Sequence, residues 1–281
     1  MTCDLHTHTY HSDGTDSPRE LARLAKESGL SAIALTDHNT VSGLPEFLSA
    51  TEEYGIIGVG GTEISTDYDG VELHIIGLFI EPEYYGAVTD FVAPMMERKA
   101  RANDELVERL LKDGYVIDYE RAKREAGGQI NRAHIATELI RAGYVKSPEE
   151  AFGGLLRKNG KYYTVTKRID VFETISFIKS IGGVAILAHP FLELNESELR
   201  RFLPLAKKAG LDAMEVHYSK FDEETTALAS NIAKELDILP SGGSDYHGWR
   251  KPGVALGVGK GNLSVDFSIY EALLQKKNNF T

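Results

Sequence analysis

The stretch DLHTHTYHSDG (residues 4–14) decides the fold, because two of its histidines come directly after a short run expected to form a strand. The same arrangement recurs along the chain, with histidine or acidic residues at the ends of other strand-like runs. These are TDHNT (36–40), GTE (61–63), LH (73–74), AHP (188–190) and GSDYH (243–247). In a parallel barrel the carboxyl ends of all strands open on one face, so these residues are expected to converge there.

Alternation of β-rich runs with amphipathic helices predicts parallel strands joined by crossover helices. Seven strands are expected, at 4–6, 32–36, 56–60, 73–79, 184–188, 213–216 and 238–241. The first helix has Ser17 as its N-cap, Pro18 at its first position and Gly29 as its stop. Further helices are expected at 44–54, 171–181, 197–209, 223–236 and 268–276.

The middle of the chain differs, because from residue 88 to about 156 it shows helical periodicity and almost no strand signal. Helices are expected at about 88–112, 119–126, 132–142 and 148–156, the third capped by Asn131. This part is also basic: residues 97–168 hold 16 Lys or Arg against 11 Asp or Glu, and the remainder holds 15 against 31. We therefore predict a barrel from residues 1–87 and 169–281, with 88–168 as a helical insertion over the carboxyl ends of the strands.

Composition excludes several classes of protein. The net charge of −11 over 281 residues argues against binding of duplex DNA, and no apolar run reaches the length of a membrane helix. The start of the chain lacks the features of a secretory signal. A single cysteine, Cys3, cannot form an internal disulfide, which fits a cytoplasmic protein and leaves nitrogen and oxygen as the metal ligands.

The histidine and acidic residues at the strand ends have the chemistry of a transition-metal site. Imidazole and carboxylate without thiolate suit Mn, Fe, Zn or Co rather than Ca or a structural zinc. The candidate ligands, enough for two or three ions, are His6, His8, Asp13, His38, Glu63, His74, His189, Asp245 and His247.

These motifs, in this order, resemble the PHP (polymerase and histidinol phosphatase) superfamily of metal-dependent phosphoesterases. The resemblance implies a distorted (β/α)7 barrel and a hydrolase of phosphoric esters with two or three divalent ions, manganese first among them. It implies one ion held by His6, His8, Glu63 and Asp245. It implies a second held by Glu63, His74 and His189, and a third held by Asp13, His38 and His247. Some relatives have histidine where this chain has Asp13.

The insertion resembles the subgroup that acts on nucleoside 3′,5′-bisphosphates and on the 5′ ends of RNA. The resemblance rests on Arg98 and Arg101 on one helix, on Arg132 and His134 at the start of another, and on the basic run RKNGKYY (157–163). The arginines are expected to bind substrate phosphates. His134 is expected either to donate a hydrogen bond to phosphate or to protonate the leaving oxygen. With Glu63 and Asp245, which hold the ions that generate the nucleophile, His134 completes the expected catalytic residues.

Two other functions compete with this interpretation. An amidohydrolase also uses His-x-His and a late aspartate on a barrel, but its metal bridge is often a carboxylated lysine. A non-catalytic PHP-type binding domain is the third reading, and the intact ligand set counts against it. The expected partner is therefore a small phosphorylated substrate, a nucleotide or a short single-stranded RNA.

Several other residues near these motifs have explanations that do not require metal binding. Asp4 and Asp37 are expected to orient ligands rather than to bind metal. His11 and His217 are left as either site residues or structural ones. The glycine pair at 242–243 is expected to serve a tight turn or a close backbone approach.

Overall fold

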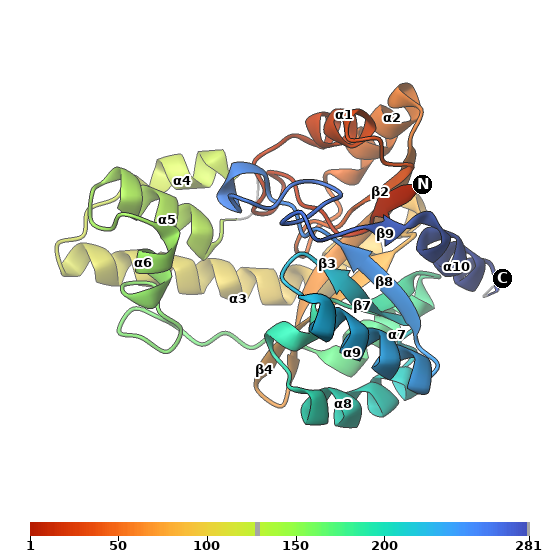
Figure 1. Cartoon of the computed structure of the whole chain (residues 1–281). Helices are drawn as coiled ribbons and strands as arrows, with labels where there is room; N and C mark the ends of the chain where they lie inside the picture. The colour runs from red at the N-terminus through yellow and green to blue at the C-terminus, as the bar shows by residue number, and fades with distance from the viewer. Residues whose placement is uncertain (127–129, 280–281) are drawn as a thin grey trace.

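The structure is a computed structural model that describes residues 1–126 and 130–279. Within these residues a single sheet has the strand order β8-β7-β6-β4-β3-β2-β1-β9, with β5 paired to β3. The strands are β1 (Thr2–Asp4), β2 (Ala32–Leu35), β3 (Ile57–Tyr68), β4 (Val71–Leu78), β5 (Ile169–Asp170), β6 (Val184–Leu187), β7 (Ala213–Tyr218), β8 (Leu239–Gly243) and β9 (Val265–Asp266). The sheet curls into a nearly closed barrel (Figure 1).

The barrel closes where the segment after β1 meets the segment after β8. The amide of Leu5 donates to the carbonyl of Gly242 at 3.2 Å, and the amide of Asp245 donates to the carbonyl of His6 at 2.9 Å. The amide of His8 then donates to the carbonyl of Tyr246 at 2.9 Å. The two histidine-rich motifs at the ends of the sequence are therefore neighbours across the barrel seam.

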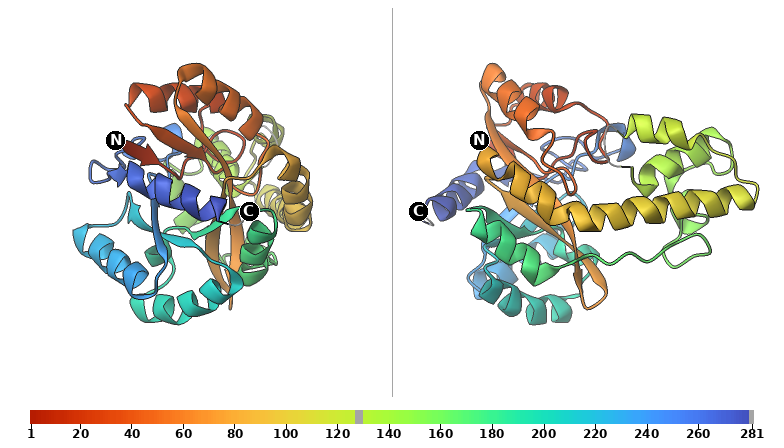
Figure 2. Two further views of the ribbon diagram at one scale, coloured as in Figure 1. Left: turned by 90° about the vertical axis from the view of Figure 1, so that its right-hand side faces the viewer. Right: turned by 180° about the vertical axis from the view of Figure 1, so that it is seen from behind.

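Helices cover the outside of the barrel (Figure 2, left). Those against the barrel are α1 (Pro18–Glu27), α2 (Leu44–Tyr54), α7 (Val171–Ser180), α8 (Glu196–Ala209), α9 (Glu223–Glu235) and α10 (Phe267–Asn278). Short 3₁₀ turns lie at η1 (Pro82–Tyr84), η2 (Pro190–Leu192) and η3 (Gly248–Arg250). Apolar faces of these helices pack on Val, Ile and Leu side chains of the strands to form the core. Within the described residues, no helix is both long enough and apolar enough to cross a membrane.

The mixed α/β barrel confirms the predicted fold class, and each of the seven predicted strands overlaps an observed strand. The largest differences are at β3, which ends eight residues later than predicted, and at β1, which shares only Asp4 with the predicted strand. The first helix has the predicted cap, because the Ser17 hydroxyl accepts from the Glu20 amide at 3.0 Å. Two short strands, β5 and β9, were not expected, because a run of two residues carries no periodic signal.

The expectation of parallel strands throughout is wrong for β4, which runs antiparallel to both β3 and β6. The cause is the two-residue turn of Asp69 and Gly70, whose φ angles are +49° and +83°. A connection this short can join only antiparallel neighbours, and Asp-Gly is a favoured pair for such a hairpin.

The middle of the chain forms α3 (Tyr85–Lys112), α4 (Tyr119–Glu125), α5 (Arg132–Arg141) and α6 (Pro148–Gly153). The long α3 leaves the barrel, and α4, α5 and α6 pack along its far part (Figure 2, right). Nine buried side chains, among them Leu106, Leu110 and Leu139, form a hydrophobic cluster separate from the barrel core. Asn131 caps α5 as predicted, its side chain accepting from the amides of Ala133 and His134. The boundaries at residues 88 and 168 stay a prediction.

Candidate metal centre

Glu63 lies at the centre of the predicted ligands. Its side chain is buried on β3, and an isolated parallel bridge pairs its backbone with that of His38, which follows β2. Oε2 of Glu63 lies 3.2 Å from His6 Nε2, 3.3 Å from His8 Nε2 and 3.0 Å from His38 Nδ1. Oε1 lies 2.8 Å from His74 Nδ1 and 3.0 Å from His189 Nε2. Five imidazoles, from the ends of β1, β2 and β6 and from β4, thus surround one carboxylate.

Asp245 joins this group across the barrel seam. Its Oδ1 lies 3.3 Å from His8 Nε2 and 3.7 Å from His6 Nε2. Asp245 and His189 have φ angles of +56° and +29°, an uncommon backbone region for residues other than glycine, and both lie where the chain turns at the end of a strand. Such conformations cluster at functional sites.

Gly243 brings β8 against the first motif. A Cβ atom at this position would lie 2.4 Å from the Cβ of His6 and 2.5 Å from its amide nitrogen. Neither distance is tolerated between real atoms, so any side chain here would push His6 away from Asp245. Of the two readings of this glycine, close backbone approach is the one that the geometry supports.

A second group lies at the mouth of the barrel. Oδ1 of Asp13 is 3.1 Å from His247 Nε2 and 3.9 Å from His8 Nδ1, and its Oδ2 is 3.8 Å from His38 Nε2. Three further groups of atoms are spaced closely enough to bind an ion. They are His6 with Glu63 and His189, His6 with His8 and Asp245, and His38 with Glu63 and His74. All nine predicted ligands belong to these four groups, and four of them belong to two groups each: His6, His8, His38 and Glu63.

Unpaired atoms show that the donors fit metal ions. Nδ1 of His8, Nδ1 of His38 and Oε2 of Glu63 are buried and form no hydrogen bond within the described chain. They lie close to other polar atoms, with Nδ1 of His38 3.0 Å from Oε2 of Glu63, but a buried polar atom without a hydrogen bond is costly, so these atoms are suited to binding a cation. His6 is also set in the right tautomer: its Nδ1 lies 2.9 Å from Glu215 Oε1, a pure acceptor, so Nε2 presents a lone pair to the cluster. This donor set of imidazole and carboxylate fits first-row transition metals.

The histidines and carboxylates shift one another's pKa values. Burial would raise the pKa of Glu63, but His38, His6 and His74 outweigh it and hold that pKa well below its usual range. Burial would lower the pKa of His74, but Glu63 opposes it and raises that pKa to about 10. For His38 burial prevails and lowers the pKa to about 4. Glu63 is therefore ionised at neutral pH, the state that binds metal.

Glu215 on β7 is a functional residue that the sequence did not reveal. One of its oxygens lies 2.9 Å from His6 Nδ1, and the other accepts the amide of His189 at 2.6 Å. Tyr218 on the same strand donates its hydroxyl to Asp245 Oδ2 at 2.8 Å. Glu215 follows Met214 in a run that reads as an ordinary buried strand, so the only signal was an acidic residue at a position expected to be apolar.

Glu215→Gln should weaken metal binding roughly 10- to 100-fold, the usual effect of losing a carboxylate that orients a ligand histidine. An amide has one acceptor oxygen, so it cannot serve both His6 and His189. The measurement is the metal dissociation constant, with Glu173→Gln on the exposed face of α7 as the control. Equal constants for the two variants would contradict the role of Glu215.

Asp4 and Asp37 hold the backbone of the ligand loops rather than the imidazole rings. Asp4 accepts the amides of Ser244 and Gly257, each at 2.8 Å. Asp37 accepts the amide of Thr9 at 2.8 Å and the hydroxyl of Ser12 at 2.6 Å. Both act as supports, in agreement with the expectation.

His11 and His217, for which the sequence allowed either a site role or a structural role, lie outside the four ligand groups. His11 Nδ1 contacts the Ser42 hydroxyl at 2.9 Å on the surface. His217 is half-buried on β7, and burial lowers its pKa.

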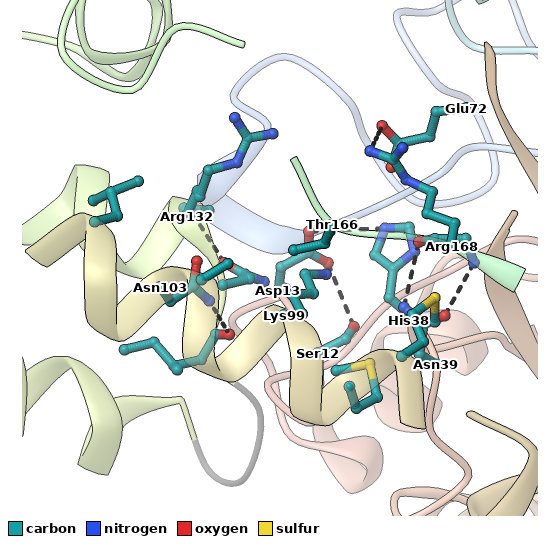
Figure 3. Close-up of a pocket in the computed structure, with 18 of the residues that line it drawn as sticks. Ser12, Asp13, His38, Asn39, Glu72, Lys99, Asn103, Arg132, Thr166 and Arg168 are labelled. Carbon is teal, nitrogen blue, oxygen red and sulfur yellow. Dashed lines mark hydrogen bonds and ion pairs between the residues drawn. The ribbon is translucent and has the colours of Figure 1, made fainter. Parts of the chain in front are cut away.

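A pocket of about 230 Å³ opens between the metal centre and the inner face of the insertion. Its lining includes three predicted metal ligands, Asp13, His38 and His74. Lys99, Arg132 and Arg168 bring positive charge to the same pocket (Figure 3). Burial lowers the pKa of Lys99, while the nearby carboxylates of Asp13 and Glu72 oppose that shift. Arg168 donates to Glu72 at 2.6 Å. The pocket thus joins a polar, cationic wall to the ligand cluster.

Of the predicted substrate residues, Arg132 lines this pocket, and Arg98, Arg101 and His134 are not among its lining residues. Arg98 donates its Nε to the carbonyl of Lys167 at 3.1 Å, and Arg101 is exposed. The ring of His134 is buried, with Nδ1 accepting the Asn131 amide and Nε2 3.2 Å from Arg250. Burial, reinforced by Arg250, lowers the pKa of His134 to about 4. The roles assigned to these three residues stay predictions.

The family model described as "PHP domain" matches residues 4–138. The chain is 33% identical over 250 residues to a 5′-3′ exoribonuclease of Haemophilus influenzae, which covers 88% of this chain and 91% of that one. It is 30% identical to a phosphoribosyl 1,2-cyclic phosphate 1,2-diphosphodiesterase of Eggerthella lenta, with coverage of 88% and 95%. It is 27% identical to a 3′,5′-nucleoside bisphosphate phosphatase of Chromobacterium violaceum, with coverage of 87% and 86%.

Solved structures share the fold over nearly the whole chain. A candidate metal-dependent phosphoesterase from Bifidobacterium adolescentis superposes with a TM-score of 0.87 at 30% identity, covering 98% of this chain and 96% of that one. A protein from Chromobacterium violaceum described as an amidohydrolase, with bound sulfate and no metal, gives a TM-score of 0.84 at 26% identity, with coverage of 92% and 90%.

Proposed function

The chain belongs to the PHP domain family, and from that membership we propose that it is a metal-dependent phosphoesterase that hydrolyses phosphate esters of nucleotides. The observation that carries the proposal is the position of Glu63, which lies within 3.3 Å of five imidazoles beside a pocket lined by cations. Nucleoside 3′,5′-bisphosphates and the 5′ ends of short RNAs are the proposed substrates.

Glu63, the six histidines, Asp13 and Asp245 would hold two or three divalent ions, and we propose manganese as the native metal. Bound ions of this kind polarise the phosphoryl oxygens and lower the pKa of a water ligand, which supplies a nucleophile at neutral pH. Glu215 keeps the lone pair of His6 directed at the cluster. Tyr218 and Lys251 both contact Oδ2 of Asp245 and leave its Oδ1 to face His6 and His8.

The pocket walls would bind the phosphate groups. Lys99, Arg132 and Arg168 present cationic donors, and guanidinium groups bind phosphate in a bidentate manner. Arg132 also lies over the rings of Phe152 and Tyr163, at 5.6 and 4.9 Å from their centroids. These contacts fix the guanidinium before substrate arrives, which limits the entropy lost on binding.

The amidohydrolase reading is kept as the alternative, since one structural neighbour carries that description. In this chain a glutamate, Glu63, occupies the position among the imidazoles where a carboxylated lysine would be expected in that class. A screen for released phosphate and for hydrolysis of amides and lactones distinguishes a phosphoesterase from an amidohydrolase. Manganese-loaded protein is offered adenosine 3′,5′-bisphosphate, a short 5′-phosphorylated RNA, p-nitrophenyl phosphate, and a panel of amides and lactones. Hydrolysis of the amides or lactones without any phosphate release would overturn the proposed function.

Lys99→Met should lower kcat/KM for adenosine 3′,5′-bisphosphate by roughly 10- to 100-fold, the effect of losing a charge-assisted contact of about 1.5–3 kcal/mol. Methionine keeps the length of the side chain and removes the charge. Lys112→Met, at the exposed end of the same helix, is the matched control. Arg101→Met measured in parallel tests the earlier prediction for that arginine. A Lys99→Met enzyme as active as the Lys112→Met control would contradict the role of Lys99.

A further inference from the structure

A second pocket, of about 520 Å³, adjoins the first. The two pockets share Tyr163, Thr166 and Arg168 on their walls, so they lie side by side. The second pocket extends along the loop 158–168 toward the β3–β4 hairpin, and its lining includes Asp67 and Gly70 but none of the nine proposed metal ligands. It therefore leads away from the reacting centre.

The position of Arg168 marks the boundary between the pockets. Arg168 donates to Glu72 at 2.6 Å, and Glu72 in turn lies 3.8 Å from His74 Nε2 at the edge of the metal centre. A substrate phosphate at the metal centre would thus lie on one side of Arg168 and the second pocket on the other. A molecule bound in the first pocket and long enough to pass Arg168 would reach the second pocket.

Three cations line the second pocket, and two of them, Lys158 and Arg168, form ion pairs with Glu72 at 3.7 and 2.6 Å. Lys158, Lys167 and Arg168 line it, and Arg98 contacts the backbone of Lys167. The side chain of Lys167 is exposed and makes no ion pair with any residue in the described ranges. The two acids on the wall are engaged locally: Asp67 accepts the Gly70 amide at 3.0 Å, and Asp170 caps α7. An anionic extension is therefore favoured.

We propose that this second pocket binds the next nucleotide of a short single-stranded oligonucleotide whose first nucleotide occupies the pocket beside the metal centre. Its phosphate would lie among Lys158, Lys167 and Arg168, and Tyr163, which borders both pockets, offers a ring on which a base can stack. This inference rests on the proposed function and adds to it a site that separates oligonucleotides from nucleoside bisphosphates.

The test is the double variant Lys158→Met/Lys167→Met, with Lys146→Met, an exposed lysine of the insertion outside both pockets, as the control. KM and kcat are measured on a 5′-phosphorylated RNA trinucleotide and on adenosine 3′,5′-bisphosphate, with metal content and Tm checked. We expect KM for the trinucleotide to rise roughly tenfold and kcat/KM for the bisphosphate to stay within about twofold of wild type. The salt dependence of trinucleotide binding should also fall, by about 0.7 in log–log slope, because the proposed site neutralises one phosphate.

The possible failures are distinguishable. Wild-type enzyme that hydrolyses the bisphosphate but not the trinucleotide would overturn this inference and leave the proposed function standing, whereas wild-type enzyme that hydrolyses neither would overturn both. Unchanged trinucleotide kinetics in the double variant, or equal losses on both substrates, would also overturn the inference. Lys167→Met alone, at an exposed side chain, repeats the test if the double variant has a lowered Tm.

Discussion

Glu63→Gln should remove nearly all phosphoesterase activity, with a loss at least as large as the roughly 10²- to 10³-fold seen when one oxyanion donor is deleted. The carboxylate lies within 3.3 Å of five imidazole nitrogens and belongs to two of the four groups of atoms that would hold metal ions, so its loss would weaken both groups. Glutamine keeps the shape but carries one acceptor oxygen and no charge. Metal content per chain should fall together with activity.

Glu173→Gln is the control, because it makes the same substitution on the exposed face of α7, outside the four groups of metal-ligating atoms and outside both pockets. It should keep its metal and most of its activity. A Glu63→Gln enzyme with wild-type turnover and metal content would contradict the central place of Glu63.

Removal of metal should lower the melting temperature by an amount on the order of 10 °C. A ligand present at a thousand times its dissociation constant stabilises the folded state by about 4 kcal/mol, and each kcal/mol shifts Tm by about 2–4 °C in a chain of this size. The metal-free cluster also keeps buried donors without partners, among them His8 Nδ1 and Glu63 Oε2. The measurement is thermal unfolding of chelated and manganese-loaded protein.

The same comparison on Glu63→Gln provides the control, since the melting temperature of this variant should change much less when metal is added. A melting temperature that does not change when metal is removed from the wild-type protein would contradict the assignment of these donors to a metal centre.

The sequence predicted the convergence of the metal residues because the motifs follow strands and strand ends meet on one face of a barrel. It did not predict how the groups share atoms. Glu63 contacts His38 as well as the expected partners, because a backbone bridge joins Glu63 on β3 to His38, which lies beyond the end of β2. The antiparallel course of β4 had a readable signal, the Asp-Gly turn at 69–70, which the expectation of crossover helices obscured.

The sequence did not indicate Lys99 as a pocket residue, for a different reason. Arg98 and Arg101 share a helix face by their spacing, but spacing alone does not say which face meets the pocket. The buried side chains of α3 identify the face that meets the pocket. Val92, Met95, Asn103 and Leu106 recur at helical intervals, and Lys99 lies on the same face of the helix. Glu215, Tyr218 and Arg168 carried no such pattern, because each depends on contacts between segments far apart in the sequence.

The central claim is that the cluster around Glu63 holds at least two ions that hydrolyse a nucleotide phosphate ester. Its most direct test is phosphate release from adenosine 3′,5′-bisphosphate while manganese is titrated into chelated enzyme. The account predicts no release without metal and a rate that rises to its plateau at two or three equivalents per chain. Full turnover by the chelated enzyme, or a plateau reached at a single equivalent, would contradict it.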